Sequence, residues 1–306
     1  MSFRVSAAFQ TAIKGEKNSS VALVSGGRSG IGLAVAKKLA SFDFIDHVIA
    51  VSRSITPQDV APYPKLVALA ADVTTEEGRE TIVSKVKEYH DKKQQLRYLV
   101  HSAGSIEPIK SVLDIKPEEM RKSMVLNCEA PFFLTTALYP FMKPMDSSGG
   151  VAGRVLHVSS GAAHGAPPVG WAAYGIGKAA FFQSYKVLER EFRQEGGHVV
   201  VGSFKPGVVD TSMQGTIRAA SQDSMPVVEN FRNMKAKTEE AKNSAPHKAR
   251  PPPKGALDSP DNVAFFAEFL LLGTTDEEFA NASDTNEYDI RDSKLYPLWI
   301  DEELLP

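Results

Sequence analysis

Residues 21–42, VALVSGGRSGIGLAVAKKLASF, pass from a short apolar run through a glycine-rich turn into a segment whose apolar residues have helical spacing. A strand, a glycine-rich turn and a helix in this order form an arrangement that binds dinucleotides. Gly26 permits the tight turn, Gly30 lets the backbone approach a pyrophosphate, and Gly32 lets the helix pack close to the strand. The free N–H groups at the start of the helix would face the phosphates.

The chain beyond this turn keeps alternating between short β-branched runs and longer segments with helical periodicity. Strands are expected at residues 47–52, 66–71, 98–101, 154–158 and 199–204, and helices at 75–90, from Pro117 to 142, and at 171–195. Short buried strands that alternate with helices are typical of a parallel sheet covered on both faces. The pattern therefore predicts an α/β fold, a Rossmann-type doubly wound parallel sheet of six or seven strands, within a single catalytic domain over residues 20–306.

Two segments depart from this alternation, after which it resumes. Residues 1–19 are basic and read as a flexible extension, with an organellar leader as the minor alternative. Residues 213–258 lack strand signals, and an insert of this length is usually a functional lid or a disordered loop; a substrate lid is predicted here. A helix is expected at 259–272, with Ser259 as N-cap and Pro260 at its first position, and a last strand at 287–290. Lysines and arginines of the insert either attract an anionic substrate or form a solvated loop: Lys235, Lys237, Lys242, Lys248, Arg250 and Lys254.

Composition limits the possible partners. The 306 residues hold 35 Lys+Arg against 37 Asp+Glu, and a net charge of -2 argues against nucleic acid as a ligand. The single cysteine, Cys128, cannot form an intramolecular disulfide, which indicates a reducing compartment such as the cytoplasm. Because no apolar run approaches about 20 residues, no membrane span is expected, and no metal site is predicted.

The end of the second predicted strand indicates which cofactor binds. In such folds an acid about 20 residues after the glycines binds the ribose 2′-hydroxyl of NAD. The count from Gly32 reaches Ser52 and then Arg53, so a cation stands where a 2′-phosphate would bind. Arg28, inside the glycine-rich turn, adds a second cation. NADP(H) is therefore predicted in preference to NAD(H), whereas the alternative is that Arg53 is only a solvated residue.

A second group of polar residues points to proton transfer. Tyr174 and Lys178 are four residues apart on a predicted helix, so they share a face. An ammonium beside a phenol favours the phenolate, which makes the tyrosine a usable proton donor near neutral pH. Ser160 follows a predicted strand at the carboxyl edge of the sheet, where doubly wound folds bind ligands. Asn127 lies inside a predicted helix, where its side chain competes with the backbone.

Over residues 20–212 these motifs resemble the short-chain dehydrogenase/reductase family. The glycine pattern is present at Gly26, Gly30 and Gly32, with Ser25 where the family usually has Thr. The remaining matches are Asp72-Val73, Asn127, Ser160, the pair Tyr174 and Lys178, and the segment Pro206-Gly207 with Val209 and Thr211. The sequences around Tyr174 and Pro206 look most like the sepiapterin reductase and benzil reductase branch.

The resemblance implies a reductase that transfers hydride from NADPH to a ketone or diketone carbon, with Asn127, Ser160, Tyr174 and Lys178 as catalytic residues. It implies that Tyr174 protonates the oxygen, Ser160 orients it, Lys178 lowers the pKa of Tyr174 and holds the ribose, and Asn127 anchors a relay water. The residues expected at the cofactor are Ser25, Gly26, Arg28, Ser29, Gly30, Ile31, Gly32, Arg53, Asp72, Val73, Ser102, Ala103, Gly104, Tyr174, Lys178, Pro206, Gly207, Val209 and Thr211. Those expected at the substrate are Ser160, His164, Trp171 and Met213.

The sequence also departs from the family pattern. His101-Ser102 replaces two asparagines after the fourth strand, and His101 is expected to be a hydrogen-bonded core residue. Ser160 lies 14 residues before Tyr174 rather than 13, so an extra residue is expected in the 166–168 turn. Two alternative functions stay open: an NADP+-dependent alcohol dehydrogenase that works in the oxidative direction, and a cofactor-binding sensor with little turnover. The resemblance further implies a homodimer that pairs through the long helices at 117–142 and 171–195.

Overall fold

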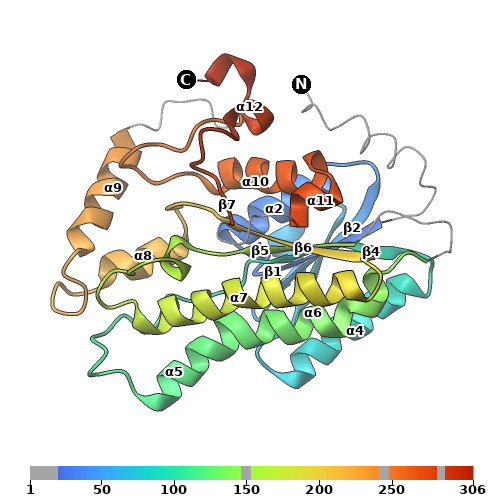
Figure 1. Cartoon of the computed structure of the whole chain (residues 1–306), viewed down its shortest axis with the longest axis horizontal. Coiled ribbons are helices and arrows are strands. Elements are labelled where there is room, and N and C mark those ends of the chain that lie inside the picture. The colour runs from blue at the N-terminus through green and yellow to red at the C-terminus, as the bar shows by residue number, and fades with distance from the viewer. Residues whose placement is uncertain (1–19, 146–152, 241–247, 281–286, 306) are drawn as a thin grey trace.

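The computed structural model describes residues 20–145, 153–240, 248–280 and 287–305, and its centre is one parallel sheet (Figure 1). Within these residues the sheet has seven strands in the order β3-β2-β1-β4-β5-β6-β7. Their bounds are β1 Ser20–Ser25, β2 Ile45–Ser52, β3 Leu66–Ala70, β4 Gln95–His101, β5 Gly153–Val158, β6 Val199–Lys205 and β7 Tyr288–Asp289. The predicted doubly wound parallel sheet is thereby confirmed, including the last strand. The predicted extension at residues 1–19 lies outside the described residues.

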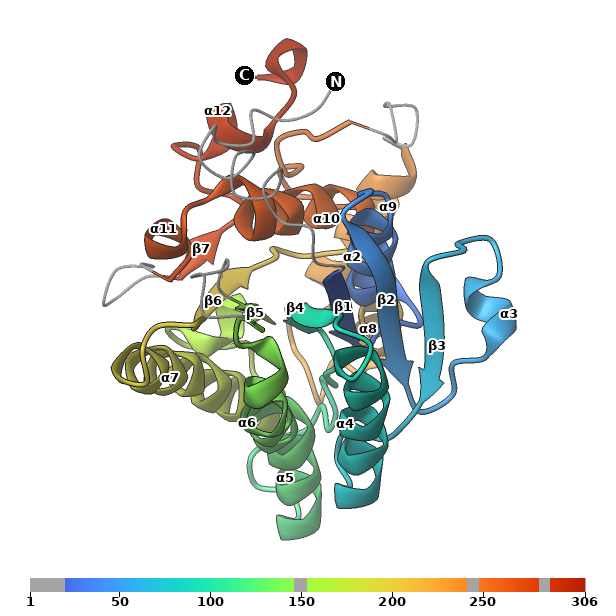
Figure 2. The same cartoon turned by 90° about the vertical axis from the view of Figure 1, so that its right-hand side faces the viewer.

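Helices cover both faces of the sheet, as predicted (Figure 2). Since successive side chains of a strand point to opposite faces, Ala22 and Val24 of β1 pack in one apolar cluster and Val21 and Leu23 in another. The first cluster includes α2 (Gly30–Ala40), α10 (Pro260–Glu268) and α11 (Asp276–Ala280). The second includes α4 (Glu76–His90), α6 (Ala130–Met142) and α7 (Ala172–Gln194).

Two of the predicted helices contain a turn of π-helix. The helix from Pro117 is built of α5 (Pro117–Met124), a π-helical turn at Val125–Glu129, and α6. The C-terminal helix α10 likewise continues into a π-helical turn at Phe269–Gly273. Its predicted start is confirmed, because the Ser259 side chain accepts a hydrogen bond from the Asn262 backbone at 3.1 Å.

The strand order places a binding site at one edge of the sheet. β1 pairs with β2 on one side and with β4 on the other, so the chain winds outward in two directions from this point. Ligands of doubly wound folds bind at the carboxyl ends of the strands beside such a switch point. The described part of the predicted insert forms α8 (Ser212–Ala219) and α9 (Val228–Glu240), which lie beyond this edge, where α7 begins (Figure 1). The remaining short helix, α3 (Pro57–Val60), follows β2, and α12 (Tyr296–Trp299) follows β7.

Candidate active site

A cavity of about 600 Å³ opens at the carboxyl ends of the strands and gathers most of the predicted site residues. Its lining runs from the glycine-rich turn past the ends of β2 to β6 to the insert. Four of the predicted site residues are not among the residues that line it: Ser25, Gly32, Asn127 and His164. Every other residue predicted for cofactor, substrate or catalysis lines this cavity.

The glycine-rich turn has a backbone that other residues could not adopt. Gly26 has a φ of +73°, and a Cβ there would lie 2.8 Å from the backbone nitrogen of Ala103. A Cβ on Gly32 would lie 2.3 Å from the carbonyl oxygen of Gly26, so this glycine lets α2 start directly against the turn. Ser25 lies beneath the turn, where its hydroxyl accepts a hydrogen bond from the Ala103 backbone at 3.4 Å. The result is a close-packed turn whose helix N-terminus faces the cavity.

Cations and one carboxylate stand at the end of the cavity beside β2 and β3. Arg53 follows β2 directly and is exposed. Arg28 donates to the Ser54 hydroxyl at 2.8 Å and lies 3.5 Å from the Asp59 carboxylate, so the segment after β2 holds its side chain. Asp72 accepts hydrogen bonds from the backbone and hydroxyl of Thr74 at 2.9 and 2.7 Å, which orients its carboxylate after β3.

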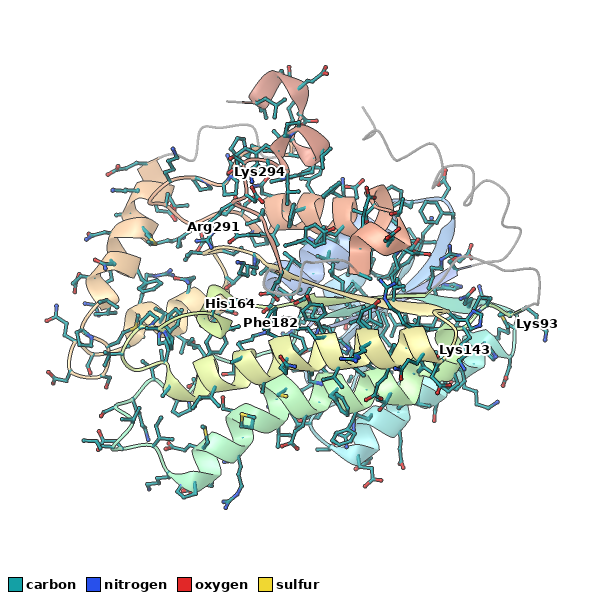
Figure 3. All side chains as sticks on the ribbon, in the orientation of Figure 1. Lys93, Lys143, His164, Phe182, Arg291 and Lys294 are labelled. Carbon is teal, nitrogen blue, oxygen red and sulfur yellow. The ribbon has the colours of Figure 1, made fainter. Side chains whose placement is uncertain are left out.

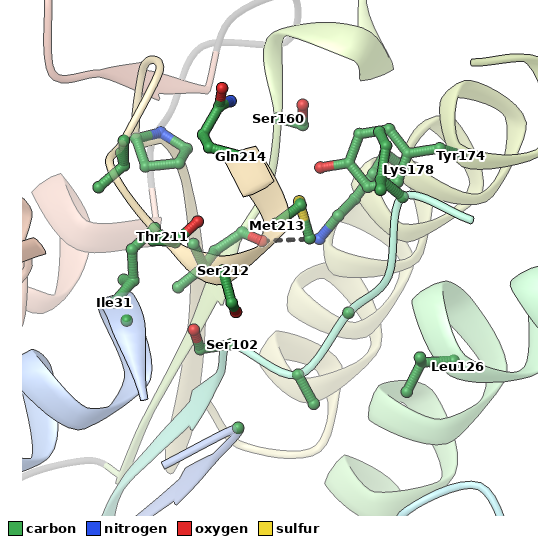
Figure 4. Close-up of a pocket in the computed structure, with 18 of the residues that line it drawn as sticks. Ile31, Ser102, Leu126, Ser160, Tyr174, Lys178, Thr211, Ser212, Met213 and Gln214 are labelled. Atoms are coloured by element: carbon green, nitrogen blue, oxygen red, sulfur yellow. Dashed lines mark hydrogen bonds between the residues drawn. The ribbon is translucent and has the colours of Figure 1, made fainter. Parts of the chain in front are cut away.

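Ser160, Tyr174 and Lys178 meet at the other end of the cavity (Figure 4). Tyr174 is 6% exposed, and burial raises its pKa, while a hydrogen bond with the Ser160 side chain opposes the rise. Lys178 is 5% exposed and donates from Nζ to the Val158 carbonyl at 2.9 Å. Burial lowers its pKa to about 8, and the negative charge of Glu287 opposes that shift. The expected lowering of the Tyr174 pKa by Lys178 is not found, because desolvation of the buried phenol raises this pKa instead.

Asn127 lies in the π-helical turn and binds the loop that follows β4. Its Oδ1 accepts from the Ser105 backbone N–H at 3.1 Å, and its Nδ2 donates to the Ser105 carbonyl at 2.9 Å. A Cβ on Gly104 would lie 3.0 Å from the same Oδ1, so this glycine allows the close approach. The asparagine is thus satisfied by backbone outside its own helix, which explains its place inside a helical segment.

His101 and Ser102 take the places of the family's two asparagines in different ways. Ser102 lines the cavity, whereas His101 is buried with its Nε2 2.7 Å from the Thr135 hydroxyl. Thr135 donates its own proton to the Pro131 carbonyl at 2.8 Å, so the histidine must be the donor in its bond to Thr135. Burial lowers the pKa of His101 to about 3, with Lys178 adding to the effect. His101 is therefore a neutral core residue.

His164 lies away from the substrate end of the cavity, contrary to the prediction. Its ring packs edge-on against Phe182, with ring centres 4.4 Å apart, and its Nε2 lies 2.7 Å from the Glu287 carboxylate (Figure 3). Glu287 is buried beside β7 and also accepts from the Ser203 hydroxyl. The sequence predicted His164 at the substrate, but a buried carboxylate more than 100 residues away binds its ring instead.

The substrate end of the cavity is aromatic, and the insert contributes to it. The Trp171 ring centre lies 5.9 Å from that of Tyr174 and 5.5 Å from that of Phe231 on α9. Gln214 on α8 also lines the cavity, next to the predicted Met213. Phe231 and Gln214 were not predicted from the sequence. They lie in an insert that matches no segment of the family pattern, so no motif marks them. The 166–168 turn, where the extra residue is expected, lies on the cavity wall, since all three of its residues line the cavity.

Two of these basic residues of the insert pair with carboxylates in the part of the chain that the structure describes. Lys235 lies 2.7 Å from the carboxylates of both Asp210 and Glu239. Lys248 pairs with Glu303, and Lys242 falls outside the described residues. The insert contributes mainly uncharged side chains to the lining of the cavity: Met213, Gln214, Ile217 and Phe231.

The described residues contain neither a membrane-spanning helix nor a cluster of metal ligands. None of the helices in the described ranges is long and apolar enough to span a bilayer. Nor do three or more His, Cys, Asp or Glu side chains in those ranges gather in a way that could hold a metal ion.

Comparison with known proteins relates the chain to several reductases. A family model described as short chain dehydrogenase matches residues 20–222. The chain is 31% identical over 202 residues to the benzil reductase ((S)-benzoin forming) IRC24 of Saccharomyces cerevisiae, covering 65% of this chain and 74% of that protein. It is 30% identical over 213 residues to the benzil reductase ((S)-benzoin forming) of Bacillus subtilis, with 69% and 84% covered. For the sepiapterin reductase of Rattus norvegicus the identity is 30% over 221 residues, with 68% and 81% covered.

Solved structures share the architecture. The Pseudomonas aeruginosa RhlG/NADP active-site complex is 25% identical, with a TM-score of 0.64 over 83% of this chain and 90% of that one. The KRED1-Pglu enzyme is 26% identical, with a TM-score of 0.64 over 84% and 96%.

Proposed function

Because the chain belongs to the short-chain dehydrogenase/reductase family, we propose that it is an NADPH-dependent reductase of ketones and diketones in which Tyr174 is the proton donor. Its membership makes it an oxidoreductase that acts on the CH–OH/C=O pair. The observation that supports the finer proposal best is the cavity itself. One end carries the glycine-rich turn and Arg53, and the other carries the hydroxyls of Ser160 and Tyr174.

The residues present fit a nicotinamide dinucleotide. The turn at Gly26 and Gly30 has positive φ and leaves no room for a Cβ at Gly26, so backbone N–H groups at the start of α2 are open to a pyrophosphate. Arg28 and Arg53 would hold a 2′-phosphate, Asp72 and Val73 the adenine end, and Pro206 to Thr211 the nicotinamide end. When bound, this group supplies the hydride that the protein side chains cannot provide.

The protein's own residues would orient the carbonyl and move the proton. Ser160 would donate a hydrogen bond to the carbonyl oxygen, and the developing negative charge would strengthen this bond. Tyr174 would deliver its proton to that oxygen, and the buried Lys178 would hold the ribose of the cofactor. The bonds from Asn127 to Ser105 would fix the loop beside Lys178, where a relay water would sit. A phenol whose pKa is raised by burial keeps its proton until the oxygen becomes basic enough to take it.

The proton donor is tested with Tyr174→Phe. We expect loss of NADPH-dependent turnover on a panel of diketones, quinones and pterins, with cofactor binding retained. Tyr185→Phe, further along α7, is the matched control and should keep its activity. Retained turnover in Tyr174→Phe with cofactor bound would refute the assignment.

The cofactor preference is tested at the end of β2. Arg53→Ala should weaken NADPH binding at least about tenfold, the cost of a lost charged hydrogen bond, and leave NADH binding unchanged. The RhlG structure is an NADP complex, which supports by analogy the proposed preference for NADPH over NADH. Arg190→Ala, at an exposed arginine of α7, serves as control. Tighter binding of NADH than of NADPH to the parent protein would overturn the preference.

A cytoplasmic homodimer is part of the same proposal. Phe133 on α6 and Ile176 on α7 are 51% and 50% exposed, and apolar side chains of this size on two long helices suit a helix-to-helix interface. Sedimentation of the full chain should give the mass of two copies. A monomer across the micromolar range would count against it.

A further inference from the structure

Glu287 is a buried acid that the mechanism above does not use. Its side chain has no exposed surface, and it directly precedes β7 at the edge of the sheet. One carboxylate oxygen accepts a hydrogen bond from the Ser203 hydroxyl on β6, and the other lies 2.7 Å from the Nε2 of His164. Because a carboxylate only accepts, His164 carries a proton on Nε2 and donates it here. These two donors are what allow an acid to be buried at this place.

The contact with Glu287 fixes one end of the turn that carries Ser160. Ser160 is the N-cap of a 3₁₀ turn at Gly161–Ala163, and its Oγ accepts from the Ala162 backbone N–H at 3.1 Å. The turn closes with a bond from the His164 backbone N–H to the Gly161 carbonyl at 3.1 Å. Ser160 and His164 are therefore the two ends of one short hydrogen-bonded unit.

Packing around this turn is sparse. Gly161 and Gly165 are exposed, and a Cβ on either would meet no atom within 4 Å. Ala162 is buried in the apolar cluster that includes Tyr174, which holds the middle of the turn. The far end is held at His164, by its ring contact with Phe182 and by its bond to Glu287 (Figure 3). Since a loop with few contacts opens easily, loss of this bond should loosen the turn.

We propose that Glu287 is a positioning residue, which through His164 holds the turn of Ser160 and so fixes the Ser160 hydroxyl beside the carbonyl oxygen of the substrate. This inference rests on the proposed reductase function. A hydroxyl that stabilises a developing charge acts best when it is held in place before the reaction. A looser turn should therefore lower kcat and leave the affinity for the cofactor nearly unchanged.

The negative charge of Glu287 provides a competing explanation for the same effect. This charge opposes the lowering of the Lys178 pKa, so its removal alone could alter the site. Glu287→Gln removes the charge but keeps an acceptor for His164 and offers a donor to Ser203. Glu287→Met removes the charge and both bonds. His164→Phe removes only the bond and keeps a ring to pack on Phe182.

Steady-state kinetics with NADPH and benzil compares the three variants. We expect kcat to fall about ten- to a hundredfold in His164→Phe and Glu287→Met, with the Kd of NADPH changed less than about twofold, and Glu287→Gln to stay within about threefold of the parent. Glu268→Met removes another buried glutamate, which pairs with Lys38, and should keep its kcat. Equal losses in Glu287→Gln and Glu287→Met would assign the effect to charge and overturn the inference. An unchanged kcat in His164→Phe would also overturn it.

A Ser160→Ala background shows whether the effect passes through the serine. In this background His164→Phe should change the residual kcat less than about twofold, because the hydroxyl that the turn positions is already absent. A further loss as large as in the parent would mean that the bond to Glu287 supports the fold in general, and it would overturn the positioning role.

Hydrogen exchange of the ligand-free protein separates this inference from the proposed function, because it needs no turnover. In His164→Phe the backbone amides of Ala162, Ala163 and His164 should exchange about tenfold faster, as expected when one hydrogen bond is lost, while those of β1 stay unchanged. Faster exchange in a chain that reduces no carbonyl would refute the function and leave the anchoring of the turn standing. Unchanged exchange would overturn the anchoring even in an active enzyme.

Discussion

Replacing Lys178 with methionine should abolish activity and yet stabilise the fold. The lysine is almost fully buried, and burial lowers its pKa from the ordinary 10.5 to about 8. Since each pKa unit corresponds to about 1.4 kcal/mol, keeping the ammonium in this site costs about 3 kcal/mol of folding free energy at neutral pH. The variant also loses the hydrogen bond to the Val158 carbonyl, which contributes about 1 kcal/mol. We therefore expect a net gain of about 2 kcal/mol at pH 7.

The pH dependence of this gain distinguishes charge burial from better packing. The unfolded chain binds the lysine proton more tightly than the folded chain, so the parent protein gains stability as the pH rises from about 8 to 10.5. The advantage of Lys178→Met should be complete below pH 8 and should shrink above it.

Urea denaturation of parent and variant, followed by circular dichroism at pH 7, 8.5 and 9.5, measures the difference. Lys186→Met on the same helix controls for the loss of a lysine from α7. A Lys178→Met variant that is less stable than the parent at pH 7, or a stability difference that does not change with pH, would contradict the cost assigned to the buried ammonium.

Three further outcomes are expected. Arg154→Met should lower the free energy of unfolding by about 3–5 kcal/mol in urea denaturation without changing the active site. The reason is that the buried guanidinium binds the Leu271 and Thr274 carbonyls and pairs with Asp276. An unchanged stability would contradict this prediction. The His101 ring, with a pKa of about 3, should show constant NMR shifts from pH 8 to about 4.5. The fold should lose stability as the pH falls below about 6.5, because the unfolded chain then takes up a proton on this histidine. A titration of the His101 ring near pH 6.5 would contradict its burial as a neutral residue. Phe231→Ala should lower kcat/KM for aromatic ketones about two- to tenfold and leave small aliphatic ketones nearly unaffected, the size expected from loss of an aromatic contact; equal losses for both would contradict a specific ring contact.

The parts of the site that sequence alone predicted are those whose signals are local. Gly26 and Gly32 are required by the backbone of one turn, and Tyr174 and Lys178 by the spacing of one helix. Alternating apolar runs likewise predict a parallel sheet, because the period of a strand or helix is a property of neighbouring residues. Together with the family's motifs, these local patterns predicted the sheet and the residues at its carboxyl edge.

The parts that sequence missed depend on contacts between distant segments. His164 binds Glu287, which directly precedes β7, instead of lining the cavity. No local sequence pattern links these two residues. The prediction that the Tyr174 pKa is lowered was likewise wrong. Burial by the surrounding fold desolvates the phenol and raises its pKa, although a lysine lies one helical turn away.

For this protein, sequence by itself determined the fold, the family, and the candidate cofactor and catalytic residues that lie between the glycine-rich turn and Lys178. Only the tertiary structure decided which side chains form the substrate end of the cavity. Phe231 and Gln214 come from an insert whose helices have ordinary sequences, and they matter because packing against Trp171 and the strand ends brings them to the cavity. A helix pattern states which face is apolar, but it cannot state which neighbour that face meets.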